Sequence, residues 1–488
     1  MARPSTLTYD RGTLLLHPPP KGKSWLEFVT WDDRVEKFRL PARDYRRFVE
    51  VTREEGVDIV DKAKGFKELK LTSEADKEPY KHQLEALNAW KSQGRQGVVV
   101  LPTGAGKTYV AQLAMLETPR STLIVVPTLD LMHQWYANLS AAFPEAEVGL
   151  LGGGSKDETP VLIATYDSAA IFAEKLGNRY GLLIFDECHH LPGDFVRTIA
   201  EYSLAPYRLG LTATPERSDD KHHDLDTLIG SIVYRKAPED LAGGALAEHR
   251  IEQIRVTLSA DERTEYDKLI EQRNAFLSRS GIFLGSLDGW QRFVQASARS
   301  SEGRAAMLAH RAARQIAFGT EAKIRVLAEL LTKHFTDRVL IFTDDNATVY
   351  RISQAFLIPA ITHQTKVKER HATLQAFRDG SYPRVVTSRV LNEGVDVPEA
   401  NVAVVLSGTG STREYIQRLG RILRKGEGKL ALLYEVVAED TSEEGVSKRR
   451  RGERFVKKDS RKTEPSNEQP SLNFEQIKSG DAASFEDL

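Results

Sequence analysis

The chain has 488 residues, and at about 150 residues per domain this length predicts roughly three structural units. Hydrophobic residues make up 41% and charged residues 28% of the chain, a balance that excludes collagen-like proteins and excludes disorder for most of the chain. The 68 Lys and Arg residues are offset by 69 Asp and Glu residues. A nucleic-acid site would therefore have to be a local surface, because the net charge is close to zero.

Apolar runs and cysteine content indicate the cellular setting. No apolar run approaches the roughly 20 residues that cross a bilayer, and residues 1–20 lack the apolar core of a signal peptide. The lone cysteine, Cys188, cannot form an internal disulfide and cannot by itself supply a thiolate zinc site. We expect a cytoplasmic protein without membrane contact.

Residues 1–70 predict a small α+β domain. β-rich pieces at residues 12–16 and 25–30 precede a helix that we expect over residues 42–55. This domain is the first of the expected units.

From residue 98 onward the pattern changes to short apolar runs separated by helix-length segments. Such runs are typical of buried parallel strands in an α/β sheet. In the first lobe, residues 71–235, the runs are 98–101, 122–126, 161–165 and 182–185. In the second lobe, residues 236–440, they are 339–342, 384–387, 402–406 and 430–434. The pattern predicts two α/β lobes in tandem.

Two further segments depart from this pattern. Residues 258–318 have no strand-like run but place Tyr266, Leu269 and Ile270 on one helix face, which predicts a helical insertion. After residue 440 the composition is polar, and Lys448 to Lys462 holds nine basic and two acidic residues. We expect a disordered tail over residues 441–488.

A glycine-rich loop follows the first apolar run and precedes a helical segment. In such a loop, backbone N–H groups hold phosphates, Lys107 reaches the β- and γ-phosphates, and the Thr108 hydroxyl ligates Mg²⁺. The strict pattern would place glycine at the position of Leu101, so a chance glycine-rich turn is the alternative. The predicted nucleotide-binding residues are Pro102, Thr103, Gly104, Ala105, Gly106, Lys107 and Thr108.

A pair of carboxylates ends the apolar run at residues 182–185. Asp186 and Glu187 follow it directly, at the strand end where open α/β sheets bind ligands. Asp186 can hold Mg²⁺ and Glu187 can deprotonate the attacking water, a division of labour that phosphoryl transfer requires. An acidic surface loop is the alternative. We interpret Cys188 as a packing residue and His189 as a hydrogen-bonding group.

With these motifs the sequence resembles the superfamily 2 helicases. Asp186 to His189 read as a D-E-x-H box, and Thr212 to Thr214 as a third helicase motif. Further matches follow in the expected order at residues 80–83, 126–128, 164–168, 340–343, 392–396 and 417–424. Residues 124–128, 174–179, 356–363 and 414–424 resemble the archaeal type of XPB helicase, and this similarity extends over nearly all of the chain except the tail. The resemblance implies two RecA-like lobes.

The resemblance also assigns roles toward ATP. Gln83 is implied to read adenine through its amide, and Gly394 and Asp396 to close the nucleotide cleft from the second lobe. Arg421 and Arg424 lie one helical turn apart and are implied to act on the γ-phosphate, the alternative being a solvated helix face. The residues implied to couple hydrolysis to movement are His189, Thr212, Thr214 and Gln417.

Other positions are implied to contact DNA. Thr128, Thr165 and Ser388 follow apolar runs in motifs that contact the strand backbone without reading bases, although each taken singly could be a helix cap. Arg217 and Asp219 are the ends of a triplet that reads Arg-Glu-Asp in the family and is implicated in unwinding. Here the middle residue is serine.

The remaining segments take their roles from the same resemblance. Residues 1–70 occupy the place of a damage-recognition domain, and residues 258–318 that of a thumb that grips DNA. In the thumb, Trp290 and Phe293 either stack on DNA or belong to a core.

The resemblance therefore implies an ATP- and Mg²⁺-dependent DNA helicase or translocase that moves 3′ to 5′ in nucleotide excision repair. Single-stranded, forked or damaged duplex DNA is the expected partner. An RNA-directed superfamily 2 helicase is one alternative, because motor motifs do not report the sugar. An ATP-gated clamp that recruits a nuclease is the other, which makes a nuclease an expected partner protein.

Overall fold

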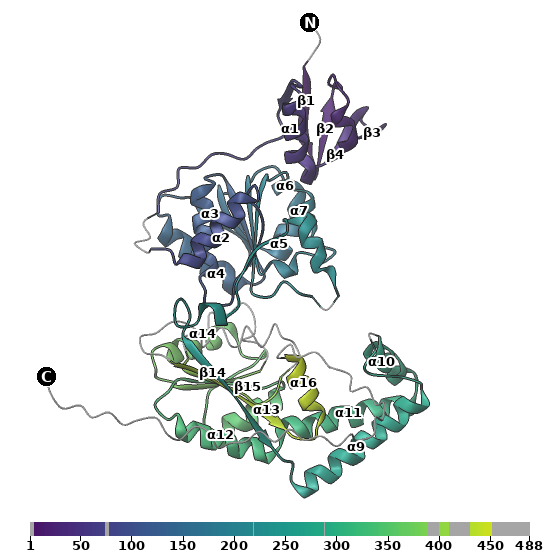
Figure 1. Cartoon of the computed structure of the whole chain (residues 1–488), viewed down its shortest axis with the longest axis vertical. Helices are drawn as coiled ribbons and strands as arrows, with labels where there is room; N and C mark the ends of the chain where they lie inside the picture. The colour runs from purple at the N-terminus through teal and green to yellow at the C-terminus, as the bar shows by residue number, and fades with distance from the viewer. Residues whose placement is uncertain are drawn as a thin grey trace, which may run out of the picture. The chain divides into compact units, whose positions relative to one another are not determined.

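The computed structural model describes residues 4–73, 78–217, 219–286, 288–388, 400–408 and 430–450. The chain divides into a unit of residues 1–452 and a unit of residues 453–488. The described residues belong to the first unit, and Figure 1 shows how their helices and strands follow one another along the chain.

The N-terminal domain is a five-stranded sheet with one α-helix. Strands β1, β2, β4 and β3 are joined antiparallel, while β5 runs parallel to β1, in the order β3-β4-β2-β1-β5. Its elements are β1 (Ser5–Asp10), β2 (Thr13–His17), the 3-10 helix η1 (Ser24–Phe28), β3 (Thr30–Asp32), β4 (Lys37–Pro41), η2 (Ala42–Asp44), α1 (Tyr45–Glu54) and β5 (Ile59–Asp61).

The prediction of β structure over residues 25–30 is wrong for most of that segment, which forms η1. Trp25 explains the difference because its ring is buried edge-on against Phe38, with ring centroids 5.0 Å apart. Its indole N–H donates to the carbonyl of Gly22, 3.0 Å away, which closes a local turn. Burial of one aromatic ring therefore overrides a strand-like composition.

The first lobe is an eight-stranded sheet in the order β13-β6-β12-β11-β7-β10-β8-β9, parallel except for the pair β8 and β9. Its strands are β6 (Gln96–Val100), β7 (Thr122–Val126), β8 (Val148–Gly152), β9 (Ser155–Lys156), β10 (Val161–Thr165), β11 (Leu182–Asp186), β12 (Tyr207–Thr212) and β13 (Ile232–Arg235). Its helices are α2 (Lys81–Ser92), α3 (Lys107–Glu117), α4 (Leu129–Ala142), α5 (Tyr166–Ile171), α6 (Ala173–Leu176), η3 (Cys188–His190), α7 (Thr198–Glu201), η4 (Lys221–Asp224) and α8 (Leu225–Leu228).

Helices cover both faces of this sheet (Figure 1). In β11, Leu182 and Ile184 pack into the core that contains residues of α2, α3 and α4, while Leu183 and Phe185 pack into the core formed with α5, α7 and α8. The alternation follows from the two-residue period of a strand. The same period places the Asp186 side chain on the face of Ile184, which is the face that α4 covers.

The second lobe is a six-stranded parallel sheet in the order β14-β19-β18-β15-β17-β16. Its strands are β14 (Glu248–Val256), β15 (Val339–Phe342), β16 (Ala360–Ile361), β17 (Arg384–Thr387), β18 (Val402–Val405) and β19 (Leu430–Ala438). Its helices are α12 (Glu321–Lys333), α13 (Asn346–Phe356), α14 (Val367–Arg378) and α16 (Ser442–Arg450), and a short 3-10 turn, η5 (Glu239–Leu241), precedes the sheet.

Three helices fill the range in which the sequence predicts a helical insertion: α9 (Ala260–Arg279), α10 (Gly289–Arg299) and α11 (Ser301–Gly319). Helices α9 and α11 lie side by side (Figure 1). A capping box starts α9: the Ser259 hydroxyl accepts the backbone N–H of Glu262, and the Glu262 carboxylate accepts the backbone N–H of Ser259. Phe276 and Phe293 lie in a small core of these helices.

The boundary predicted for the disordered tail is wrong, because residues 442–450 form α16. Glu443 is 1% exposed and pairs with Lys323 of α12, also 1% exposed, at 2.6 Å. The Lys323 ammonium also donates to the carbonyl of Leu406. The segment is polar in composition, and the sequence does not show that Glu443 is buried against Lys323 of a distant helix. The rest of the predicted tail, residues 451–488, lies outside the described residues.

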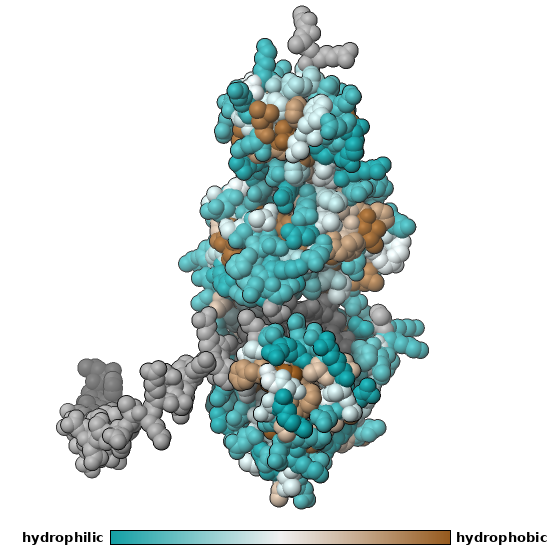
Figure 2. Space-filling view, turned by 90° about the vertical axis from the view of Figure 1, so that its right-hand side faces the viewer, coloured by the Kyte–Doolittle hydropathy of each residue, from teal (hydrophilic) through white to brown (hydrophobic). Residues whose placement is uncertain are grey.

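The surface in Figure 2 is mainly hydrophilic, with hydrophobic residues in separate small areas. Within the ranges that the structure describes, no helix is long and apolar enough to span a bilayer.

Candidate active site

The glycine-rich loop joins β6 to α3 and has the backbone shape of a phosphate loop. Gly104 and Gly106 have φ of +89° and +81°, in the left-handed region that favours glycine. A Cβ atom on Gly106 would lie 2.3 Å from Nε2 of Gln83, so a side chain there would also collide. Lys107 begins α3 directly after the loop. The loop therefore presents the N-terminus of an 11-residue helix, where backbone N–H groups favour anions.

Gln83 and His82 of α2 pack against this loop. The Gln83 amide N–H donates to the carbonyl of Ala105 at 3.2 Å, and its oxygen accepts from the backbone N–H of Tyr80 at 2.9 Å. The His82 ring nitrogen Nε2 lies 2.8 Å from the same Ala105 carbonyl. The predicted adenine-reading residue is thus beside the loop, although its amide is engaged with protein groups.

Lys107 and Asp186 bring opposite charges to the same edge of the sheet. The Lys107 ammonium donates to the carbonyl of Leu101 at 3.2 Å. Asp186 ends β11 and is 7% exposed. Burial raises the pKa of the Asp186 carboxyl, while the charge of Lys107 and a hydrogen bond from Trp135 favour its ionised form.

Glu187 is held in a strained backbone conformation, with φ of +47°. Its Oε2 accepts from the Thr212 hydroxyl at 3.4 Å and lies 3.5 Å from Nδ1 of His189. The turn that this φ creates separates the two carboxylates: Asp186 stays with the sheet and Glu187 faces the end of β12. One carboxylate is thus suited to a cation and the other to a water molecule, as the motif predicts.

Three of the four residues predicted to couple hydrolysis to movement, His189, Thr212 and Thr214, form a hydrogen-bonded cluster in the first lobe. His189 is fully buried, with Nδ1 3.1 Å from the Thr212 hydroxyl. That hydroxyl also lies 3.1 Å from the Thr214 carbonyl and accepts the Thr214 backbone N–H. The Thr212 hydroxyl therefore links the segment after β12 to the Glu187 carboxylate.

Arg217 and Asp219 bind each other rather than standing free. Two guanidinium nitrogens donate to the two Asp219 carboxylate oxygens at 2.8 and 2.7 Å, and the third donates to the carbonyl of His189 at 2.6 Å. Arg217 holds the pKa of the Asp219 carboxyl well below its usual range. This clamp anchors the loop to the D-E-x-H segment, and its contact with DNA remains a prediction.

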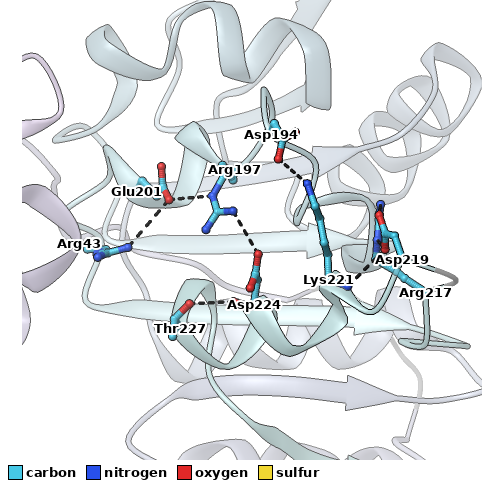
Figure 3. A network of polar contacts seen from close by, with 9 residues as sticks. All are labelled: Arg43, Asp194, Arg197, Glu201, Arg217, Asp219, Lys221, Asp224 and Thr227. Atoms are coloured by element: carbon cyan, nitrogen blue, oxygen red, sulfur yellow. Dashed lines mark hydrogen bonds and ion pairs between the residues drawn. The ribbon is translucent and has the colours of Figure 1, made fainter.

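A network of ion pairs lies beside this loop, with side chains that range from half-buried to exposed (Figure 3). Arg197 pairs with Glu201 and with Asp224 of η4, and Lys221 of the same turn pairs with Asp194. Arg43 of the N-terminal domain lies 3.9 Å from Glu201. The sequence analysis did not identify this network, because its members come from separate turns without a shared motif.

The three predicted strand-contact residues differ in their surroundings. Thr128 and Thr165 are N-caps of α4 and α5, and their hydroxyls accept the backbone N–H groups of Leu131 and Ser168. Both residues are thus helix caps, as the alternative states. Ser388 is only 4% exposed. Each contact with DNA remains a prediction.

In the helical insertion, Phe293 is fully buried whereas Trp290 is 47% exposed. Phe293 is thus a core residue, and Trp290 keeps an accessible ring. The other predicted residues lie outside the described ranges: Ser218, Gly394, Asp396, Gln417, Arg421 and Arg424.

Two aromatic donors that the sequence analysis missed reach Asp186. The indole N–H of Trp135 in α4 donates to Asp186 Oδ2 at 2.8 Å, and the Tyr166 hydroxyl in α5 donates to the Asp186 backbone carbonyl at 3.1 Å. Trp135 follows His133 and Gln134, and Tyr166 lies in the matched segment 164–168, but neither context points to a contact with Asp186.

The residues present fit a nucleotide with Mg²⁺. The cradle of Gly104 and Gly106 suits phosphate, and the Thr108 hydroxyl and Asp186 carboxylate are the hard oxygen donors that Mg²⁺ prefers. Within the described ranges no three His, Cys, Asp or Glu side chains gather as a metal site. Mg²⁺ commonly takes one or two protein oxygen ligands together with substrate phosphates, and Thr108 and Asp186 would supply the protein ligands.

Comparison with known proteins agrees with this geometry. The model of the XPB helicase damage recognition domain matches residues 7–63, that of the type III restriction enzyme res subunit matches residues 76–217, and that of the helicase conserved C-terminal domain matches residues 322–426. The chain is 42% identical to the DNA 3′-5′ translocase XPB2 of Sulfurisphaera tokodaii over 446 residues, which are 91% of this chain and 99% of that protein. The chain belongs to the XPB family of DNA helicases.

More distant XPB family members and a solved structure extend the comparison. The chain is 34% identical to the DNA 3′-5′ helicase XPB of Mycobacterium tuberculosis over 71% of this chain and 58% of that protein. The Hef helicase domain of Pyrococcus furiosus shares the fold with a TM-score of 0.54 at 21% identity, over 75% of this chain and 97% of that one. The XPB family chain therefore has tandem RecA-like lobes, preceded by a domain that matches the damage recognition model.

Proposed function

We propose that this XPB family helicase uses ATP to move 3′ to 5′ along DNA and acts in nucleotide excision repair. One observation carries the ATP-dependent part of the proposal. Three adjacent parallel strands, β6, β12 and β11, end at one edge of the first-lobe sheet. That edge carries the phosphate loop after β6, Thr212 at the end of β12, and the carboxylates at the end of β11. That edge is where open α/β sheets bind ligands.

The chemistry follows from the positions of the side chains. Lys107 neutralises phosphate charge, and Thr108 and Asp186 hold Mg²⁺, which would screen the remaining charge on a bound nucleotide. Glu187 accepts the proton of the attacking water. Arg421 and Arg424 supply positive charge from the second lobe in the transition state, and Gly394 and Asp396 complete the cleft.

DNA is the substrate that the family membership favours. Phosphate contacts from the starts of α4 and α5 would be independent of sequence, which suits a translocase. The N-terminal domain inspects the duplex for damage, a nuclease is the partner that would act on the opened strand, and the setting is cytoplasmic.

The test is an ATPase assay with single-stranded, forked, bubble and duplex DNA beside RNA. We expect DNA, and forked DNA above all, to stimulate hydrolysis more than RNA of the same length. Equal stimulation by RNA would favour the RNA-directed alternative. Strand separation on the fork without any partner protein would count against a clamp that only recruits a nuclease.

A further inference from the structure

Asp186 is hydrogen-bonded from both faces of its sheet. On one face, the Trp135 indole N–H of α4 donates to Asp186 Oδ2 at 2.8 Å. From the other side, the Tyr166 hydroxyl of α5 donates to the Asp186 backbone carbonyl at 3.1 Å. Trp135 is 2% and Tyr166 5% exposed, and each belongs to the hydrophobic core of its own face. The end of β11 is therefore held by two buried donors.

These bonds set which lone pairs of the carboxylate stay available. The backbone N–H of Glu187 donates to Oδ1 at 3.1 Å, so each carboxylate oxygen already accepts one hydrogen bond. A carboxylate has about four acceptor positions, which leaves roughly two for a cation or its water ligands. The direction of the indole N–H thus fixes the rotation of the group that would meet Mg²⁺.

We propose that Trp135 and Tyr166 are positioning residues that hold the end of β11, so that the Asp186 carboxylate is oriented toward Mg²⁺. The inference rests on the proposed function, since it assumes that Asp186 holds Mg²⁺. It assigns to two core aromatic residues a part in the nucleotide site.

The chain offers a matched control for each donor. Trp90, fully buried in the same core as Trp135, donates its indole N–H to the carbonyl of Arg208 at 2.9 Å. Tyr180, 2% exposed in the same core as Tyr166, donates its hydroxyl to the carbonyl of Thr159 at 3.2 Å. Trp90→Phe and Tyr180→Phe therefore remove the same kind of buried hydrogen bond without touching Asp186.

The first measurement is the affinity for ADP by calorimetry, with and without Mg²⁺. We expect Trp135→Phe to reduce the gain in ADP affinity that Mg²⁺ provides by about tenfold, the lower end of the effect of removing a group that orients a metal ligand. Trp90→Phe should keep the wild-type gain within twofold. Thermal unfolding of the two variants then reports the common cost of a lost indole hydrogen bond.

The second measurement applies the same calorimetry to the tyrosine pair. We expect Tyr166→Phe to reduce the gain in ADP affinity from Mg²⁺ by less than Trp135→Phe does, because the Tyr166 bond reaches the backbone carbonyl rather than the carboxylate. Tyr180→Phe should retain the wild-type gain within twofold.

Asp186→Asn separates failure of this inference from failure of the proposed function. If Asp186→Asn keeps the full Mg²⁺ dependence, the assignment of the nucleotide site is wrong. If Asp186→Asn loses it while Trp135→Phe behaves like Trp90→Phe and Tyr166→Phe like Tyr180→Phe, the site stands and the positioning role is overturned. Should Trp135→Phe fail to fold, the pair of tyrosine variants decides.

Discussion

The end of β11 and the network around Arg217 both contain hydrogen-bonded carboxylates, but in opposite surroundings. Asp186 is 7% exposed and is held by donors from two hydrophobic cores. In the network of Figure 3, the Asp219 and Asp194 side chains are 41% and 83% exposed. Removing one partner of a buried polar group lowers the stability of the fold, because the other partner is left unsatisfied. An exposed ion pair contributes little, because water and salt screen it. The comparison predicts large effects at the first region and small ones at the second.

Lys107→Ala should have the largest effect, because it removes the charge that faces the phosphates at the buried edge. We expect nearly all ATP turnover to be lost, because both ATP binding and hydrolysis depend on that charge, while DNA binding without nucleotide persists. Steady-state ATPase rates and a DNA-binding titration check this. Lys175→Ala, an exposed lysine of the same lobe, serves as the control. Comparable turnover in the two variants would contradict the phosphate-loop assignment.

Glu187→Gln should keep ATP binding and block hydrolysis, because the amide preserves the shape of the side chain but cannot accept the proton. A general base contributes on the order of 10² to 10⁴ in rate. Nucleotide affinity and single-turnover hydrolysis measured on one preparation separate the two steps. Glu201→Gln, in the exposed network, should leave both unchanged. An unaltered hydrolysis rate in Glu187→Gln would mean that another group activates the water.

The buried ion pair of the second lobe extends the comparison to stability. A chain ending at residue 440 lacks α16 and leaves Lys323 buried without Glu443, which we expect to lower the free energy of unfolding by about 3–5 kcal/mol. A chain ending at residue 452 keeps α16 and should unfold like the full chain. Urea denaturation of the two truncations measures the difference. Equal stability would show that α16 contributes little.

Asp224→Asn tests the exposed region, where it removes the charge of one of the two carboxylates that pair with Arg197. An exposed ion pair is worth less than about 1 kcal/mol, so the free energy of unfolding should change by that amount or less. ATPase activity should stay within twofold. A large loss of stability, measured by the same denaturation method, would mean that the network acts as one unit. The exposure of a side chain would then not predict how much its ion pair contributes to stability.

The smallest expected effect on ATP turnover belongs to Ser218→Glu. A carboxylate at this position would repel nearby phosphates, so we expect faster unwinding of a forked substrate with unchanged DNA-stimulated ATPase activity. Asp219→Ala should reduce whatever unwinding remains. Strand-displacement rates measured beside ATPase rates on the same fork decide this. A wild type that already unwinds well, with no change in Ser218→Glu, would indicate that nearby acids such as Asp220 substitute for the missing carboxylate.

Strand positions could be predicted where a strand that is buried on both faces is also continuously apolar. The runs at 122–126, 161–165, 339–342 and 384–387 match β7, β10, β15 and β17, because strands covered on both faces are continuously apolar. Strand β12 was missed, since Arg208 interrupts its apolar run. The buried guanidinium of Arg208 donates to the carbonyls of Ser203, Ala205 and Leu228. Those partners are brought together only by the folded chain.

The sequence by itself determined the family, the phosphate loop and the two carboxylates after β11, because each depends on residues that are adjacent in the chain and on the two-residue period of a strand. Tertiary structure decided what holds these groups in place. Trp135 lies 51 residues from Asp186, and Lys323 lies 120 residues from Glu443. Such pairs form because packing brings buried donors and acceptors together, and a buried polar group without a partner is costly. No local pattern records that choice of partner.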